Sequence, residues 1–448
     1  MQASKKTPRF SYLEYGLILL CFSTCLAGAL LLPVDQCPDE EGRLLLTDWI
    51  VQTGTLPTGN EPEVMIPGWG FSYALHPYLS AIIGAIFKFT AACLTDSPRI
   101  LLAASRMCSV LSVTFCCFFC LRLGHRLFEK KSSALLLAVL VCFLPQVVFL
   151  GMYQNNDSLS LCAVSMMLYC LAEGFDRKWP VSSCVGVAVA FSIGLLSYYT
   201  IYGWLLMGAV FCVLAVLTEP EGSGKGRLIL NRATLIFGIC LLLAGWFFIR
   251  NACLHNGDIL GFDSESISRA QMQEQGYDLF SFIRYRDEGL SVAQFLRINE
   301  YAWLWMTAES FIGVFGHMVI YLPKIQYGIY YAVLGGAFIL FFAVLFRQKT
   351  LRRDRLLMLL MLLSGIMTLC LHFLHSYTRD FQPQGRYVIT LILPFAYMLA
   401  YGADKTTVIV RNPKPGKAAD LNPAAALIVL WFALFIWAAL GTMARMIR

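Results

Sequence analysis

The chain has 448 residues, of which 58% are hydrophobic and only 14% carry a charge. A water-soluble protein of this length cannot bury so many separate runs of about 20 apolar residues, so the composition predicts a helical integral membrane protein. The net charge of +7 does not indicate nucleic-acid binding. The basic residues form small clusters between the apolar runs, which is the pattern that membrane topology produces.

Apolar runs follow one another along the whole chain. They occur at 13–33, 76–94, 99–121, 134–152, 158–172, 180–197, 201–217, 233–249, 325–346, 356–374, 386–402 and 424–444. The basic segment with Lys5, Lys6 and Arg9 before the first run resembles the start of a signal peptide. Because the run is too long for a signal peptide and further runs follow, we expect an uncleaved first helix.

The basic clusters predict which runs cross the membrane. If every run crossed, the cluster at 122–131 and all later clusters would face outward, against the positive-inside rule. The conflict disappears if the run at 76–94 lies in the outer interface instead of crossing. We therefore expect eleven spans, with the N-terminus inside, the C-terminus outside, and only Arg445 and Arg448 on the unfavourable side.

This topology makes residues 1–448 one multi-spanning domain. The expected extracytoplasmic regions are a first loop at 34–98, a long loop at 250–324 and a shorter one at 375–385. Most of the 16 cysteines fall inside apolar runs, where they act as small hydrophobic residues. Cys37 and Cys253 are expected outside, and the sequence leaves open whether they are bonded to each other.

The first outer loop contains two adjacent carboxylates, Asp39 and Glu40. Residues 41–53 have the pattern of a short helix lying flat on the membrane, ended by Gly54 and Pro57. Asp39 falls at or near the N-cap, and helix capping alone would explain it. The positive end of a helix also favours an ionised carboxylate in a fixed place, which suits a general base.

Further polar residues are expected on the same side of the membrane. Asn156 and Asp157 begin a later span, where they either cap the helix or position an acceptor or a metal ion beside Asp39. Arg250 stands at the outer end of a span with Asp258 soon after, and it either snorkels to the interface or contacts a substrate. His317 is one of five outer histidines, and their spacing matches no zinc motif.

The segment RDFQPQGRY, residues 379–387, precedes a late span. Guanidinium groups at a membrane boundary bind phosphate in a bidentate manner, so Arg386, with Gln384 nearby, is a candidate site for a lipid phosphate. Ordinary interface anchoring by Arg386 and Tyr387 is the alternative. The stretch at 293–323 alternates aromatic residues with glycine and predicts an interfacial helix and a packed turn.

Five short motifs, taken in order, resemble the bacterial GT-C membrane glycosyltransferases. They are PDEEGR (38–43), NND (155–157), RNACLHNGD (250–258), ESFIGVFG (309–316) and QGRY (384–387). That superfamily includes protein O-mannosyltransferases, aminoarabinose transferases and the catalytic subunits of oligosaccharyltransferases, and the likeness is closest to a less characterised branch. Where that branch commonly has a histidine at the end of the first motif, this chain has Arg43, which puts an imidazole role there in doubt.

The resemblance implies an all-α, GT-C-like bundle of about eleven transmembrane helices in a bacterial plasma membrane, with interfacial helices in the first outer loop. The donor would be a sugar on a polyprenyl phosphate, and the acceptor a glycan, lipid or protein of the cell envelope. A phosphate leaves as a stable anion, so the reaction needs one base and cations rather than a general acid.

In this scheme Asp39 is the base of an inverting single displacement, and Arg386 with Arg250 holds the departing phosphate. Glu40, the other acid of the catalytic motif, and Asp157 would position the acceptor or bind a divalent cation. A flippase or transporter of lipid-linked glycans, and a polymerase or ligase, are the alternatives. Transporters usually place charges within the spans, whereas here the polar groups gather on one face.

Overall fold

The computed structural model describes residues 9–218, 224–345, 351–410 and 423–446, and nearly all of its regular structure is helical. Eight described segments are long and apolar enough to cross a membrane. They contain α1 (Tyr12–Leu31), α5 (Met107–Leu127), α8 (Asp157–Asp176), α10 (Tyr202–Leu217), α11 (Lys225–Leu243), α17 (Arg352–Thr378), α18 (Ile392–Val410) and α19 (Pro423–Gly441). The expected number of eleven spans stays a prediction.

Five shorter helices and one long helix complete the described bundle. The shorter ones are α6 (Lys131–Cys142), α7 (Pro145–Leu150), α9 (Val181–Leu195), α14 (Val292–Arg297) and α15 (Ala302–Gly313), and the long one is α16 (Lys324–Leu345). Two short strands, β1 (Val314–Phe315) and β2 (Ile320–Tyr321), form an antiparallel hairpin between α15 and α16. This helix and hairpin occupy the stretch for which an interfacial helix and a packed turn were expected.

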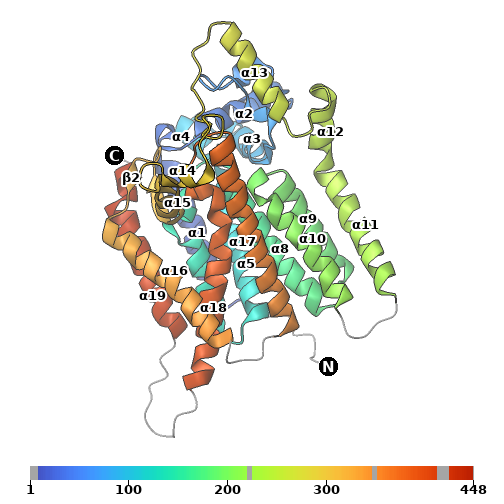
Figure 1. Ribbon diagram of the computed structural model, residues 1–448, viewed down its shortest axis with the longest axis vertical. Coiled ribbons are helices and arrows are strands. Elements are labelled where there is room, and N and C mark those ends of the chain that lie inside the picture. Colours follow the sequence, from blue (N-terminus) through green and yellow to red (C-terminus); the bar gives the residue numbers. More distant parts are fainter. Residues whose placement is uncertain (1–8, 219–223, 346–350, 411–422, 447–448) are drawn as a thin grey trace.

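An outer layer of helices covers one end of the bundle (Figure 1). It consists of α2 (Glu40–Thr53), α3 (Leu79–Ala92), α4 (Pro98–Ser105), α12 (Gly245–Leu254) and α13 (Phe262–Glu274). The apolar run at 76–94 gives α3, which packs against α2 and α4 at this end. That this run lies in the outer interface stays a prediction. With 14 residues α3 is about 21 Å long, which is shorter than the hydrocarbon core of a bilayer.

Two expected spans differ from the observed helices. The run at 99–121 is divided at Arg106, so that the long helix α5 begins only at Met107. The run at 134–152 is divided at Pro145, which cannot donate a helical hydrogen bond and starts the separate helix α7. The flat helix expected at 41–53 is present as α2 and ends at Gly54 in the left-handed conformation.

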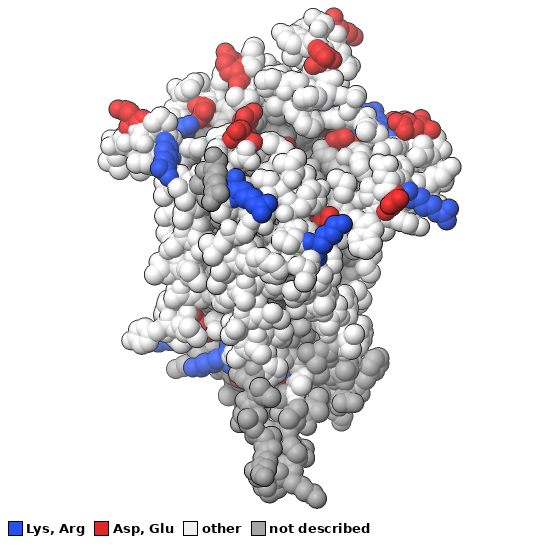
Figure 2. Space-filling model, turned by 90° about the vertical axis from the view of Figure 1, so that its left-hand side faces the viewer, with Lys and Arg blue, Asp and Glu red and all other residues white. Residues whose placement is uncertain are grey.

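The two ends of the bundle differ in charge and packing. On the face shown in Figure 2, charged side chains gather at the upper end, and a broad uncharged band separates them from those lower down. At the lower end Arg126 and Arg353 both pair with Asp176, at 3.2 and 3.0 Å, and so link α5, α8 and α17. The basic residues Lys5, Lys6, Arg347, Lys349, Arg411, Lys414, Lys417 and Arg448 lie outside the described residues.

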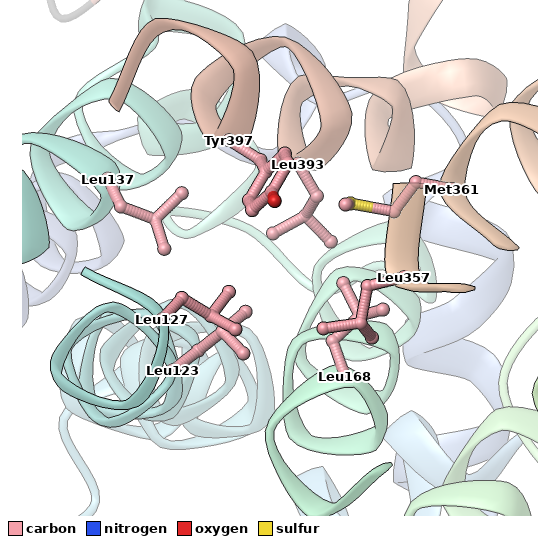
Figure 3. A pocket seen from close by; sticks show the side chains of 8 residues that line it. All are labelled: Leu123, Leu127, Leu137, Leu168, Leu357, Met361, Leu393 and Tyr397. Carbon is pink, nitrogen blue, oxygen red and sulfur yellow. The ribbon is translucent and has the colours of Figure 1, made fainter. Parts of the chain in front are cut away.

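The interior toward the lower end is tightly packed. The gap between α5, α6, α8, α17 and α18 measures about 10 Å³ and is lined by leucines, Met361 and Tyr397 (Figure 3). Such a gap holds no more than a water-sized probe, so this end of the bundle is a packed core. The described chain begins at this lower end and finishes at the upper end (Figure 1).

Candidate active site

A cavity of about 620 Å³ lies between the outer layer and the outer ends of the spanning helices. Its walls come from the first outer loop, from α13 and the segment after it, and from the upper part of α17. Side chains that line it include Asp39, Arg43, Tyr73, Asn156, Tyr198 and Tyr387. The first outer loop, the later ND motif and the segment just after QG therefore contribute to one chamber.

Asp39 occupies the N-cap position of α2, but its side chain makes no capping hydrogen bond. Its backbone is left-handed, with φ at 60°, a conformation that is uncommon for any residue other than glycine. The side chain instead forms an ion pair with Arg386. Capping therefore does not explain Asp39, and such backbone strain is typical of functional sites.

Two arginines surround the Asp39 carboxylate. Arg386 is buried, and its guanidinium also donates to the Tyr387 hydroxyl at 3.1 Å. Arg43 is buried as well, with its guanidinium 4.8 Å from the centre of the Tyr73 ring. Burial acts to raise the pKa of Asp39, but the charges of Arg386 and then Arg43 outweigh it, so the pKa lies below its usual value.

Each of these arginines keeps unused hydrogen-bonding capacity. The Nε atoms of Arg43 and Arg386 are buried and have no hydrogen-bond partner. A buried donor without a partner is costly in a native protein, and at the edge of a cavity a bound ligand is one way to satisfy it. Arg43 lines the cavity, whereas Arg386 does not line it and is connected to it through Asp39. An anionic ligand in the cavity would therefore meet Arg43 directly, and a ligand that displaces the Asp39 contact would reach Arg386, a donor set that suits a phosphate.

The neighbouring residues of the ND motif make different contacts. The Asn155 side chain accepts a hydrogen bond from the Ser158 amide at 2.8 Å and thereby caps α8. Asn156 donates to the Pro77 carbonyl at 3.1 Å and fixes the start of the outer layer. Asp157 is 5% exposed and makes no hydrogen bond to the described residues, although the charges of both site arginines act on it. Capping therefore accounts for Asn155 but not for Asp157.

Glu40 lies away from the cavity, contrary to the expectation that it acts beside Asp39. Its carboxylate is fully buried and takes two hydrogen bonds from Arg106, at 2.8 and 2.5 Å, and one from the Gln154 amide at 2.7 Å. Arg106 also donates to the carbonyls of Ala29 and Leu32, at the end of α1. Glu40 therefore has no free oxygen for an acceptor or a metal ion, and it anchors α2 instead.

Arg250 and Gln384, expected near the donor phosphate, do not line the cavity. Arg250 donates to the carbonyls of Leu56 and Pro57, both at 2.9 Å, and holds the turn that follows α2. Gln384 is the N-cap residue of the 3-10 helix that carries Arg386. Both residues thus support the walls of the chamber from behind.

The remaining candidates also take supporting positions. The Asp258 carboxylate accepts hydrogen bonds from the amides of Gly261 and Ser264, at 2.9 and 2.8 Å, and so fixes the start of α13. His317 contacts the Asp35 carbonyl through Nε2 at 2.9 Å. Cys37 and Cys253 are free thiols, the first buried and the second exposed.

The last two motifs contact each other directly. The Gly385 amide donates to the Ser310 hydroxyl at 2.6 Å. A Cβ atom at Gly385 would overlap the backbone of Phe311 and would lie 2.5 Å from the Thr307 carbonyl oxygen. Only glycine allows this close approach, which sets Arg386, the next residue, opposite Asp39.

Several residues of the cavity carry no recognisable signal in a single sequence. Tyr198 and Tyr387 stack in parallel, with ring centres 5.8 Å apart, although they come from distant segments. His76 and Glu265 face each other at 3.1 Å across the outer part of the cavity. Among the described residues no group of three His, Cys, Asp or Glu side chains is arranged to hold a metal ion.

Comparisons with known proteins agree with this architecture. The family model for dolichyl-phosphate-mannose-protein mannosyltransferases matches residues 76–250. A search of curated protein sequences gave no significant match. Among solved structures, ArnT from Cupriavidus metallidurans bound to undecaprenyl phosphate is 12% identical, with a TM-score of 0.56 over 96% of this chain and 71% of that chain.

A second similar structure is the Archaeoglobus fulgidus oligosaccharyltransferase in its apo form, 12% identical with a TM-score of 0.56. The alignment covers 95% of this chain but 55% of the archaeal one, so this chain spans about half of that protein. At such identities the likeness is one of fold. Together with the family-model match over residues 76–250, it shows that the chain is similar to membrane glycosyltransferases and shares the fold of these solved structures.

Proposed function

We propose that this protein transfers a sugar from a polyprenyl-phosphate-linked donor to an acceptor on the extracytoplasmic face of the membrane. The observation that carries the proposal is the strained Asp39, held in a cavity beside Arg386 and Arg43. The similar structures support the choice of donor, because ArnT was solved with undecaprenyl phosphate and the archaeal AglB with a dolichol-phosphate.

In the proposed reaction Asp39 accepts the proton of an acceptor hydroxyl. The acceptor oxygen forms a bond to the anomeric carbon while the bond from that carbon to the phosphate oxygen breaks. The electron pair of the broken bond stays on the phosphate, which leaves as an anion and is held by Arg386 and Arg43. One displacement of this kind inverts the configuration of the sugar.

The ion pair between Asp39 and Arg386 couples the base strength of Asp39 to the binding of the donor phosphate. While Arg386 bonds Asp39, the low pKa of the carboxylate makes it a weak base. A donor phosphate competes for Arg386, and loss of that contact raises the pKa of Asp39. The base thus gains strength only when the donor is bound, which protects the donor from wasteful hydrolysis.

Asp157 is the second acidic side chain in this scheme. Because its carboxylate makes no hydrogen bond to the described residues, it is available to orient the acceptor hydroxyl or to share a divalent cation with the substrate phosphate. Glu40, Arg250 and Gln384 support the walls and take no direct part.

The alternative of a flippase or transporter for lipid-linked glycans requires a polar path through the bundle. The gap between the helices toward the opposite end is about 10 Å³ and lined by apolar side chains and one tyrosine (Figure 3). The polar cavity, by contrast, belongs to the outer end. This distribution favours catalysis at one face over passage between two faces.

The test is the Asp39→Asn variant, assayed in a bilayer with a polyprenyl-phosphate-linked sugar by release of free polyprenyl phosphate. We expect release to fall by about 10²-fold or more, because asparagine keeps the shape but cannot accept the proton. The matched control is Glu41→Gln, an exposed acid two residues away. Undiminished release by Asp39→Asn, or no release by the wild type with any such donor, would refute the proposal.

A further inference from the structure

The cavity has a second zone beyond Asp39, on the side away from the membrane core. This outer zone is formed by α13 and the segment after it, together with the upper end of α17 (Figure 1). Three arginines line it, Arg269, Arg284 and Arg379, alongside aromatic residues that include Phe262 and Phe282. None of these three arginines takes part in the chemistry proposed above.

Aromatic rings hold two of the three guanidinium groups in place. Arg269 lies over the Phe282 ring at 3.8 Å from its centre, and Arg379 lies over the Phe262 ring at 4.3 Å. Arg269 also donates to the carbonyls of Trp69 and Phe280. A stacked guanidinium has lost much of its side-chain freedom already, so less entropy is lost when it binds an anion.

Of the three arginines, Arg284 lies 4.0 Å from the exposed Asp287 carboxylate, a weak ion pair within its own segment. Among the described residues, neither Arg269 nor Arg379 forms an ion pair. Glu265 is bonded to His76 at 3.1 Å, and Asp380 accepts a hydrogen bond from Gln382 at 2.6 Å. Burial raises the pKa of Asp380 above its usual value, although the charges of Arg269 and Arg284 act in the opposite direction. Three guanidinium groups thus line the outer zone beside two carboxylates, those of Glu265 and Asp380.

We propose that this outer zone, defined by Arg269, Arg284 and Arg379, binds an acceptor that carries a phosphate or a similar anionic group. The inference rests on the proposed function, which assigns the donor phosphate to Arg43 and Arg386. A donor attached to a polyprenyl chain stays close to the bilayer, whereas α13 lies at the far end of the molecule from the spanning helices (Figure 1). The acceptor thus approaches from the aqueous side, with its anionic group on the arginines and its hydroxyl toward Asp39.

Titration calorimetry on the full chain in phosphatidylcholine nanodiscs tests the outer zone, with glucose 6-phosphate as the probe and glucose as its uncharged match. We expect the wild type to bind the phosphate at least tenfold more tightly. Arg379→Gln should remove most of that preference, and this variant is the safest because the Arg379 side chain stacks on a ring without donating to the backbone. Arg286→Gln, on the same outer segment but not in the cavity, is the control.

A second measurement separates the two sources of phosphate. Binding of polyprenyl phosphate added to the nanodiscs should weaken in Arg43→Gln and stay unchanged in Arg379→Gln. If Arg379→Gln instead weakens the binding of polyprenyl phosphate, the outer zone serves the donor and the acceptor assignment is overturned. The assignment is also overturned if the wild type does not bind glucose 6-phosphate more tightly than glucose. If the wild type binds glucose 6-phosphate but no polyprenyl phosphate, the anion site stands and the proposed function fails.

Discussion

Under the proposed function, Asp39 is prepared for chemistry before any substrate arrives. Its backbone is left-handed, its side chain caps nothing, and the arginines next to it lower its pKa. Because a lowered pKa means that the carboxylate is lost only in more acidic solution, Asp39 stays ionised from neutral pH down past the usual range of an aspartate. The fall of kcat/KM on the acid side of its pH profile should therefore lie at low pH.

Replacing Arg386 with glutamine tests this electrostatic arrangement. The variant removes the largest attraction that lowers the pKa of Asp39, while the burial that raises the pKa remains. We expect the acid limb of kcat/KM to move to higher pH in Arg386→Gln and to move less in Arg43→Gln, with turnover reduced about 10²-fold in the first. Identical acid limbs in all three proteins would show that Asp39 is not the titrating base.

Sequence reasoning reached some of these residues and not others. Asp39 and Arg386 could be selected because an acid and an arginine at a membrane boundary are costly to place there without a purpose. The same reasoning chose Glu40, Arg250 and Asp258, which are equally polar but bind the protein itself. Composition and spacing cannot tell whether a side chain contacts its own fold or faces a cavity, because that depends on long-range packing.

At the scale of elements, two joints align Asp39 with Arg386. One is the contact of Gly385 with the end of α15, and the other is the buried pair between Glu40 and Arg106, which connects α2 to α1 and α5. The flat helix α2 could be predicted from its pattern, and α3 from the positive-inside rule. The joints could not, because each brings together residues more than 60 positions apart.

Gly385→Ala should disturb the first joint. The added methyl group would overlap the backbone of Phe311, so the QGRY segment must shift and take Arg386 with it. We expect a loss of stability of about 1–3 kcal/mol and a clear drop in sugar transfer, measured by thermal unfolding in detergent and by the release assay. Gly336→Ala, where a methyl group meets nothing within 4 Å, should leave both measurements unchanged.

Breaking the second joint should lower the stability of the protein more than breaking the first. Arg106→Gln leaves the fully buried Glu40 carboxylate without its charged partner, and we expect a loss of about 3–5 kcal/mol in the free energy of unfolding. The double variant Glu40→Gln with Arg106→Gln leaves no unpaired charge and should recover part of that loss. Strictly additive losses in the double variant would contradict a direct pair.

The two ends of the molecule differ in polarity and in packing. The polar cavity and the outer layer occupy the upper end, and a packed apolar interior with clustered ion pairs occupies the lower end. The charge pattern of the sequence predicts which end faces outward, because topology is determined by basic residues near the ends of spans, and that orientation stays a prediction. The shape of the cavity was not predictable, since it depends on how the outer layer packs.

Labelling with a membrane-impermeant maleimide on intact cells checks the proposed orientation. Cys253 is exposed in the outer layer and should react, whereas Arg177→Cys, at the end of α8 beside the lower ion-pair cluster, should react only after the membrane is opened. Both sites are read in a background in which the other exposed cysteines, Cys93 and Cys370, are serine, and Arg177→Cys is made with Cys253 replaced by serine as well. Reaction of Arg177→Cys on intact cells would reverse the orientation and place the cavity in the cytoplasm.

The contact between Asp39 and Arg386 joins positions that are 347 residues apart. During synthesis the first of these residues leaves the ribosome long before the second, so a partly inserted chain carries the acid without its cation. If the proposed function holds, competence for sugar transfer arises late, after nearly all helices have entered the bilayer. An unfinished or truncated copy would then leave the lipid-linked donors untouched.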